Sequence, residues 1–225
     1  LYFIPIVGFI LYLIIGQDYH KNKMFKAKEI EGELKYAVRR QEETIYHRQL
    51  KMTSPALNRF RDLVLYNLEA GQAVLTDNND IRIYTDGKEK FHALIEEMKR
   101  AKKYIHVQYY IIRNDEVWQD IEKVLIEKAH EGVEVRVLFD SMGCRTMHKR
   151  DWDRLKCEGI RVAEFFPAIL GQLQMRVNYR NHRKIVVIDG KVGFVGGFNV
   201  GREYIGKDEK FGYWRDTHLC IEGAA

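Results

Sequence analysis

From Asp80 onward, strand-like and helix-like patterns alternate along the chain, and this alternation restricts the possible folds more than any other feature. Four short runs rich in β-branched and aromatic residues are separated by segments whose apolar residues recur every three or four positions. The predicted strands are 81–85, 104–112, 133–139 and 160–166, and the predicted helices are 91–103, 117–132 and 151–158. Because this order lets helices bury their apolar faces against a sheet, it predicts an α/β sandwich.

A second constraint lies in residues 178–201, which read NYRNHRKIVVIDGKVGFVGGFNVG. The apolar run 185–188 ends at Asp189-Gly190, a dipeptide typical of tight turns, and 192–195 is predicted to return as the hairpin partner. Because side chains alternate between the faces of a strand, His182 and Lys184 are predicted to point the same way. An imidazole beside an ammonium combines a nucleophile or proton carrier with an anion clamp, which indicates a phosphate site.

Other residues of the same stretch fit a phosphate ligand. Gly197, with Gly196 before it, lets the backbone approach a ligand closely, and Asn199 supplies an amide at the end of the return strand. Arg183 adds a guanidinium that suits a headgroup phosphate. A purely structural role at the end of the hairpin stays open for the two glycines.

The spacing of these residues resembles a known signature. His182-x-Lys184-x4-Asp189, followed by Gly-Gly-x-Asn199, is similar to the motif of the phospholipase D superfamily. With the segment FGYWRDTH at 211–218, the stretch resembles bacterial cardiolipin synthases. The resemblance covers nearly the whole chain, but only the first half of such an enzyme. It implies a phospholipase D-like α/β sandwich that forms one half of a pseudo-twofold pair.

The resemblance also implies catalytic roles. A neutral His182 attacks phosphorus and holds it as a phosphohistidine, while Lys184 and Asn199 neutralise the phosphate oxygens. Asp216, at the start of the predicted strand 216–221, matches the acidic residue that accepts the proton of the histidine. Asp189 belongs to the catalytic motif, although its place in a tight turn favours a structural role. No metal and no cofactor are expected, because lysine and imidazolium supply the positive charge.

The N-terminal part of the chain has a different character. Residues 1–16 contain no charge and predict a transmembrane helix that is truncated at its start. Four lysines follow between residues 21 and 28, so the positive-inside rule places the rest of the chain in the cytoplasm. Residues 17–75 predict a charged helical connector, and 76–225 the first half of a phospholipase D-like catalytic domain. A signal peptide and a buried core helix are the competing interpretations of 1–16.

Composition adds only weak constraints. The net charge of +5 favours anionic partners mildly, with membrane lipid expected and no nucleic acid. The cysteines are scattered, and Cys144, His148 and Cys157 lack the spacing of a metal site. Reduced thiols in a cytosol-facing domain are therefore expected.

The resemblance implies an enzyme of the bacterial inner membrane. It would transfer a phosphatidyl group from one phosphatidylglycerol to another and release glycerol. The chain holds a single His-x-Lys, whereas the exchange also needs a proton donor for the leaving alcohol. A second motif-bearing half or a homodimer is therefore expected to complete the site, and the fragment alone to be inactive. A membrane-bound phospholipase D and a non-catalytic module that binds anionic lipid stay open as alternatives.

Overall fold

The computed structural model describes residues 6, 8–9, 35–41, 43, 59–71, 73–76, 78–165 and 180–224. The chain divides into a larger compact unit containing Asn79–Gly223 and a smaller one formed by Asp18–Asn78. Of the predicted membrane span, only residues 6, 8 and 9 are among those described. Within the described parts of the chain, no helix is long and apolar enough to cross a membrane.

The larger unit is built on one mixed sheet of seven strands in the order β1-β7-β6-β5-β2-β3-β4. The parallel strands are β2 (Tyr104–Tyr109), β3 (Glu134–Asp140) and β4 (Arg161–Phe165). The antiparallel part consists of β1 (Asp80–Asp86), β5 (Ile185–Ile188), β6 (Val192–Gly196) and β7 (Arg215–Glu222). The predicted α/β class and the predicted alternation of strands and helices are thereby confirmed.

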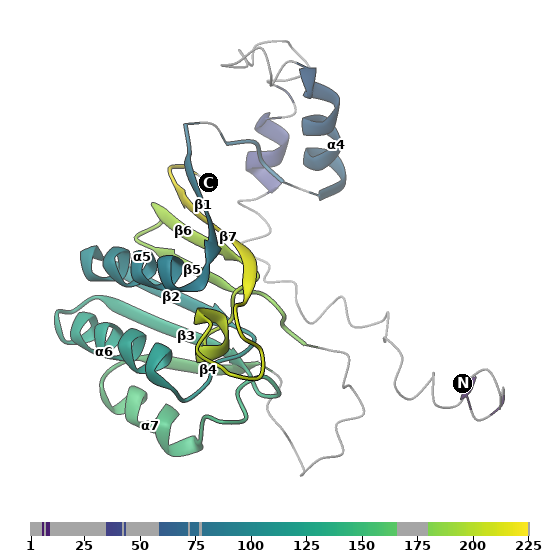
Figure 1. Ribbon diagram of the computed structural model, residues 1–225. Helices are drawn as coiled ribbons and strands as arrows, with labels where there is room; N and C mark the ends of the chain where they lie inside the picture. Colours follow the sequence, from purple (N-terminus) through teal and green to yellow (C-terminus); the bar gives the residue numbers. More distant parts are fainter. Residues whose placement is uncertain are drawn as a thin grey trace. The chain divides into compact units, whose positions relative to one another are not determined.

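Three helices pack on one face of this sheet (Figure 1): α5 (Gly87–Arg100), α6 (Glu116–His130) and α7 (Lys149–Cys157). The side chains of Asp86 and Asp115 accept hydrogen bonds from the first backbone N–H groups of α5 and α6, which explains where these helices begin. Their apolar stripes bury Leu94, Ile121 and other side chains against the sheet. Leu94 is fully buried, and replacing such a leucine by alanine typically lowers the free energy of unfolding by about 2–5 kcal/mol.

The strand predicted at 104–112 is shorter in the structure and ends at Tyr109. Beyond Tyr109 the chain no longer pairs with the neighbouring strands, because its backbone N–H groups donate to side chains instead. The N–H of Ile111 donates to the side chain of Asn199, and that of Ile112 donates to the thiol of Cys144. Ile112 then forms only an isolated bridge with Val200. The turn away from the sheet brings the end of β2 to the candidate site.

The smaller unit holds the described helical residues 35–41 and α4 (Arg61–Gly71). Val38 and Leu68 form its buried cluster, and the amide of Gln41 exchanges two hydrogen bonds with the backbone of Leu75. The helical part of the predicted connector is therefore visible where the chain is described. Its domain limits remain a prediction.

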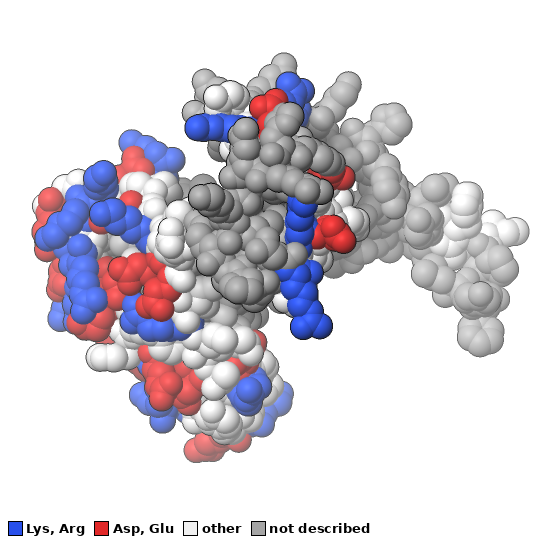
Figure 2. All heavy atoms as spheres, turned by 90° about the horizontal axis from the view of Figure 1, so that it is seen from above, with Lys and Arg blue, Asp and Glu red and all other residues white. Residues whose placement is uncertain are grey.

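Charged side chains of both signs are intermingled on the face of the molecule shown in Figure 2. Ion pairs also form along α5, where Lys99 pairs with Glu96 and Arg100 with Glu97. Such exposed pairs contribute little to stability, about 0–1 kcal/mol each. This face carries no field of a single sign.

Candidate active site

Strand directions gather the predicted site residues at one edge of the sheet. The parallel strands β2 and β3 end there, with Tyr109 and Asp140, and the antiparallel β5 begins there, immediately after Lys184. By the same pairing, β6 ends and β7 begins at this edge. His182, Lys184, Asn199 and Asp216 therefore converge from segments that are distant in sequence. Asp189, at the other end of β5, lies at the opposite edge.

His182 and Lys184 touch one another. The Nζ of Lys184 lies 2.9 Å from Nδ1 of His182 and donates a hydrogen bond of 2.7 Å to the carbonyl of the same residue. His182 is exposed, whereas Lys184 is only 4% exposed. The imidazole is thus open to a ligand, and the amine sits behind it with its position fixed by the backbone.

Both groups have perturbed pKa values. Burial lowers the pKa of Lys184 to about 8, although the carboxylate of Asp216 opposes that shift. Partial burial, and then the positive charge of Lys184, lowers the pKa of His182, against a smaller opposing effect of Asp140. At neutral pH the pair therefore consists of a neutral imidazole and an ammonium that is close to losing its proton.

The hydrogen bond between the two side chains fixes the imidazole tautomer. A protonated Lys184 can only donate, so Nδ1 of His182 must accept, and the ring proton then resides on Nε2. In this state Nε2 has no free lone pair with which to attack phosphorus. If a ligand drew the ammonium away from Nδ1, the ring proton could move to Nδ1 and Nε2 would be free to react.

Asn199 is buried, and its amide is held from both ends. Its Oδ1 accepts from the N–H of Ile111 at 3.1 Å, and its Nδ2 donates to the hydroxyl of Tyr204 at 3.0 Å. Tyr204 belongs to the short 3-10 helix η2 (Arg202–Ile205). An amide nitrogen has two hydrogens, and within the described residues the second N–H of Asn199 has no partner.

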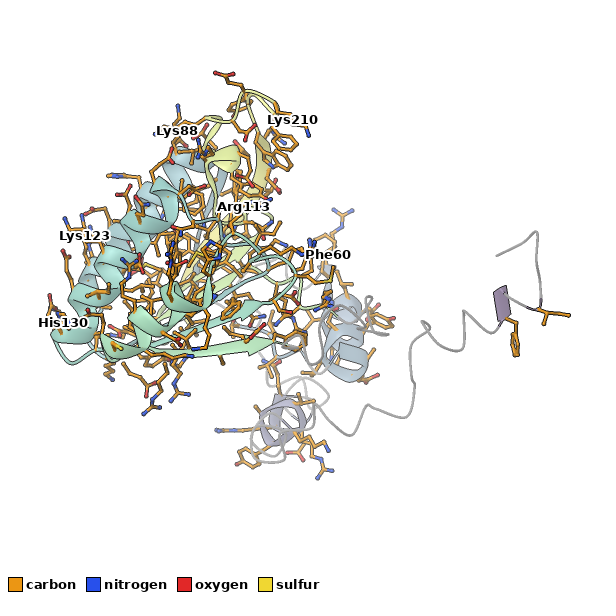
Figure 3. The ribbon with its side chains drawn as sticks, turned by 90° about the horizontal axis from the view of Figure 1, so that it is seen from below. Phe60, Lys88, Arg113, Lys123, His130 and Lys210 are labelled. Atoms are coloured by element: carbon orange, nitrogen blue, oxygen red, sulfur yellow. The ribbon has the colours of Figure 1, made fainter. Side chains whose placement is uncertain are left out.

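An ion pair holds this helix near the end of β2. Arg113, labelled in Figure 3, follows β2, and its Nε lies 3.1 Å from a carboxylate oxygen of Glu203. A Cβ on Gly201 would lie 2.6 Å from that carboxylate, so a side chain at this position would displace the Glu203 carboxylate from its place beside Arg113. The pair thereby stabilises the segment that supports Asn199.

Asp216 lies against Gly197. A Cβ on Gly197 would come within 2.0 Å of an oxygen of the Asp216 carboxylate, so the missing side chain makes room for that group. The carboxylate accepts from the N–H of Thr217 at 2.7 Å and acts electrostatically on Lys184. Among the described residues, no hydrogen bond joins Asp216 to His182. Packing against the Asp216 carboxylate therefore explains the glycine at position 197. Asp216 itself lies close enough to Lys184 to affect its pKa.

The arginines near the motif differ in their surroundings. The guanidinium of Arg180 lies 3.7 Å from the buried carboxylate of Asp140. Arg183 is exposed, and its guanidinium forms no ion pair within the described part of the chain. Of these two arginines, Arg183 is the one that presents its charge to solvent.

Asp189 binds backbone N–H groups of a neighbouring segment. Its carboxylate accepts the N–H groups of Lys102, Lys103 and Tyr104 at 2.8–2.9 Å. Burial alone would raise the pKa of this carboxyl, but the three hydrogen bonds lower it below its ordinary value. Asp189 also has a φ of 54°, a left-handed conformation that aspartate tolerates in a turn. These contacts anchor the β5–β6 turn to the start of β2.

Asp189→Asn is expected to destabilise the protein and to leave the chemistry nearly unchanged. The amide keeps one acceptor oxygen and places an NH₂ group against backbone donors, which costs about 1–3 kcal/mol. The depressed pKa adds a second signature, because its stabilisation is present above the unfolded pKa and disappears as pH falls through the folded pKa. Urea denaturation at several pH values measures both effects. An inactive variant of native stability would contradict this assignment.

Sequence reasoning missed Tyr110. Its ring centroid lies 4.6 Å from that of His182 with the planes at 47°, and Lys184 Nζ lies 5.4 Å from the same ring. The ring limits how far the imidazole can turn. The only signal in the sequence was an aromatic pair at the end of a predicted strand, which ordinary core packing explains equally well.

Comparison with known proteins shows the family to which this chain is similar. Residues 94–211 match the family described as cardiolipin synthase, PLD-like domain. The chain is 46% identical over 226 aligned residues to cardiolipin synthase 2 of Staphylococcus epidermidis, covering 100% of this chain and 46% of that protein. Cardiolipin synthase of Oceanobacillus iheyensis is also 46% identical, with 100% and 47% covered. The structure of Nuc, a phospholipase D family member from Salmonella typhimurium, has a TM-score of 0.48 at 16% identity over 65% of this chain and 84% of that one.

The sheet, its helices and the matched segment define a phospholipase D-like α/β domain. The chain belongs to the cardiolipin synthase family. It spans about half the length of the curated relatives that it matches.

Proposed function

We propose that the protein is a cardiolipin synthase that transfers a phosphatidyl group between two phosphatidylglycerol molecules and releases glycerol. The transfer passes through a phosphohistidine: the imidazole bonds to phosphorus as glycerol leaves, and the hydroxyl of the second lipid then displaces the imidazole. Splitting the exchange in this way replaces one difficult displacement by two easier ones.

The observation that carries the proposal is the contact between His182 and Lys184 at the sheet edge. Asn199 lies at the same end of the sheet, where its Nδ2 donates to Tyr204, and Arg183 offers a further exposed cation. These donors suit the charge that builds on the phosphate oxygens in the transition state. Their chemistry requires no metal ion.

The exchange also needs an acid for the leaving glycerol and a base for the incoming hydroxyl. His182 is the only histidine in a His-x-Lys arrangement among the 225 residues. We infer that a second motif-bearing half, or a second copy of the chain, supplies the partner histidine across a pseudo-twofold axis. Asp216 is the candidate to accept the Nδ1 proton of His182 once Lys184 has turned toward phosphate.

The proposed location is the bacterial inner membrane, with the catalytic domain on the cytoplasmic side. It rests on the uncharged run at 1–16 and the lysines that follow it. A substrate whose acyl chains stay in the bilayer also requires the site to work at the membrane surface.

The product formed from phosphatidylglycerol vesicles by the native-length protein in detergent tests the proposal. We expect cardiolipin and glycerol in equal amounts. Phosphatidic acid with free glycerol would instead identify a hydrolytic phospholipase D, because water would then be the acceptor. Vesicle binding without turnover would point to a lipid-binding module and contradict the enzymatic proposal.

A further inference from the structure

A row of residues crosses the sheet directly beneath the site. Gly196 on β6 pairs with His218 on β7, and the N–H of Gly196 donates to the carbonyl of Lys184. On the other side of Lys184, β2 runs beside β5, and Gln108 pairs with Ile185, so Tyr109 lies opposite Lys184. Burial of Tyr109, Lys184 and His218 places all three side chains on the helix-covered face. A Cβ on Gly196 would lie 2.7 Å from Cγ of His218, so the imidazole occupies the space that Gly196 leaves empty.

Lys90 of α5 lies over this row. It is fully buried, and its Nζ donates to the hydroxyl of Tyr109 at 2.8 Å. The same Nζ is 3.9 Å from the ring centroid of Phe91, a distance that favours the charged amine through a cation–π contact. Within the described chain, no carboxylate forms an ion pair with Lys90. Burial lowers the pKa of Lys90 well below its ordinary value.

His218 is also fully buried, and neither ring nitrogen has a hydrogen-bond partner among the described residues. Burial, together with the positive charges of Lys90 and Lys184, lowers the pKa of His218 to about 3. A buried polar group without a partner is costly, so its presence calls for a reason. Here three basic groups share one interior region, and they cannot all hold a proton.

The remaining titratable groups around His218 come from several elements. Tyr84 of β1 pairs with it directly, Asp216 and Cys220 flank it on β7, and Tyr204 of η2 lies near Asp216. Two carboxylates lie near this region: Asp216 acts electrostatically on Lys184, and Glu203 of η2 is paired with Arg113. Neither forms an ion pair with Lys90 or His218 within the described residues.

We propose that Lys90 and His218 are positioning residues of the phosphate site, which take up a proton from solvent when an anion binds at Lys184. The inference rests on the proposed phosphate site but not on the identity of the lipid. An anion at Lys184 adds negative charge in the middle of the row, between His218 on one side and Tyr109 with Lys90 on the other, and so stabilises a proton on either base. Because Lys90 and His218 have no paired carboxylate within the described residues, each can gain a proton when substrate binds. The site then becomes more positive only in the presence of substrate.

Tungstate, a dianion that mimics phosphate, allows a direct test on the native-length protein. Near pH 7, below the pKa of about 8 of Lys184, that residue is already largely protonated and adds little to proton uptake. Calorimetric titrations in buffers of different ionisation enthalpy give the number of protons taken up. We expect net uptake by the native protein, and Lys90→Met and His218→Phe are each expected to reduce it by roughly half or more.

Two variants serve as controls. Lys128→Met removes another buried lysine, which is paired with Glu131, and Lys123→Met removes an exposed one on the outer side of α6 (Figure 3). Both are expected to keep native uptake. Tyr109→Phe removes the hydrogen-bond acceptor of Lys90 and is expected to lower uptake as well, so it carries the test if Lys90→Met does not fold.

The outcomes separate this inference from the proposed function. Tungstate binding with the same uptake in native protein and in the Lys90, His218 and Tyr109 variants would overturn the inference while the phosphate site stands. Reduced proton uptake in these three variants, with native uptake in the Lys128 and Lys123 controls, would support the inference, whichever lipid product is formed. No tungstate binding by the native protein would overturn both.

Discussion

His182→Gln is expected to lower turnover of phosphatidylglycerol by at least about 10³-fold, because glutamine can neither attack phosphorus nor carry the proton. The residue is exposed apart from the contact of its ring with Tyr110, so the free energy of unfolding should remain within about 0.5 kcal/mol of the native value. Lipid product analysis and urea denaturation on the same preparation separate the two effects.

His92→Gln is the matched control, because His92 is an exposed histidine on α5, outside the motif. It is expected to be fully active. Native turnover by the His182 variant would remove the histidine from the chemistry, whatever the control shows.

Lys184→Met is expected to lower kcat/KM by about 10²–10³-fold, since the ammonium neutralises the phosphate oxygens as charge develops on them. Methionine fits the buried, unbranched path of the lysine and removes the cost of a desolvated ammonium. The variant should therefore be at least as stable as the native protein. A loss of activity accompanied by unfolding would contradict this explanation.

The pH dependence supplies a second test of Lys184. Burial brings its pKa to about 8, so the ammonium is present below that pH and is lost above it. The kcat/KM of the native protein, which reports the free enzyme, should fall as pH rises through about 8. The residual activity of Lys184→Met should lack this basic limb. A native profile that is flat up to pH ~10 would show that the charge of Lys184 is not required.

The fold was largely predictable because its signals are local. Periodicity placed the strands and helices of the α/β unit. His182 and Lys184 were predicted to share one face of a strand, but β5 begins only at Ile185, and the two side chains contact one another from the segment before it. The order of the sheet was not predictable in the same way. Nothing in the sequence of 185–188 shows that β5 pairs with β2, because both strands are short, apolar and compatible with several neighbours.

Candidate site residues could be predicted where they belong to a motif with a characteristic spacing. They could not be predicted where their role depends on contacts between segments that are distant in sequence. Tyr110 lies against His182 only because β2 and β5 are neighbours. The burial of Lys90 could not be predicted, since lysine is mostly exposed and a single sequence gives no sign that this one is buried. The role of Gly197 appears only when the carboxylate of Asp216 is seen to occupy the position of its missing side chain.

The central claim is that one phosphate group is held by Lys184 while His182 faces its central atom. A crystal structure of the native-length protein soaked with tungstate tests it most directly. We expect Lys184 Nζ to leave His182 Nδ1 for a tungstate oxygen, and the tungsten to lie within about 3 Å of His182 Nε2. Tungstate bound elsewhere, with the contact between His182 and Lys184 intact, would contradict the account.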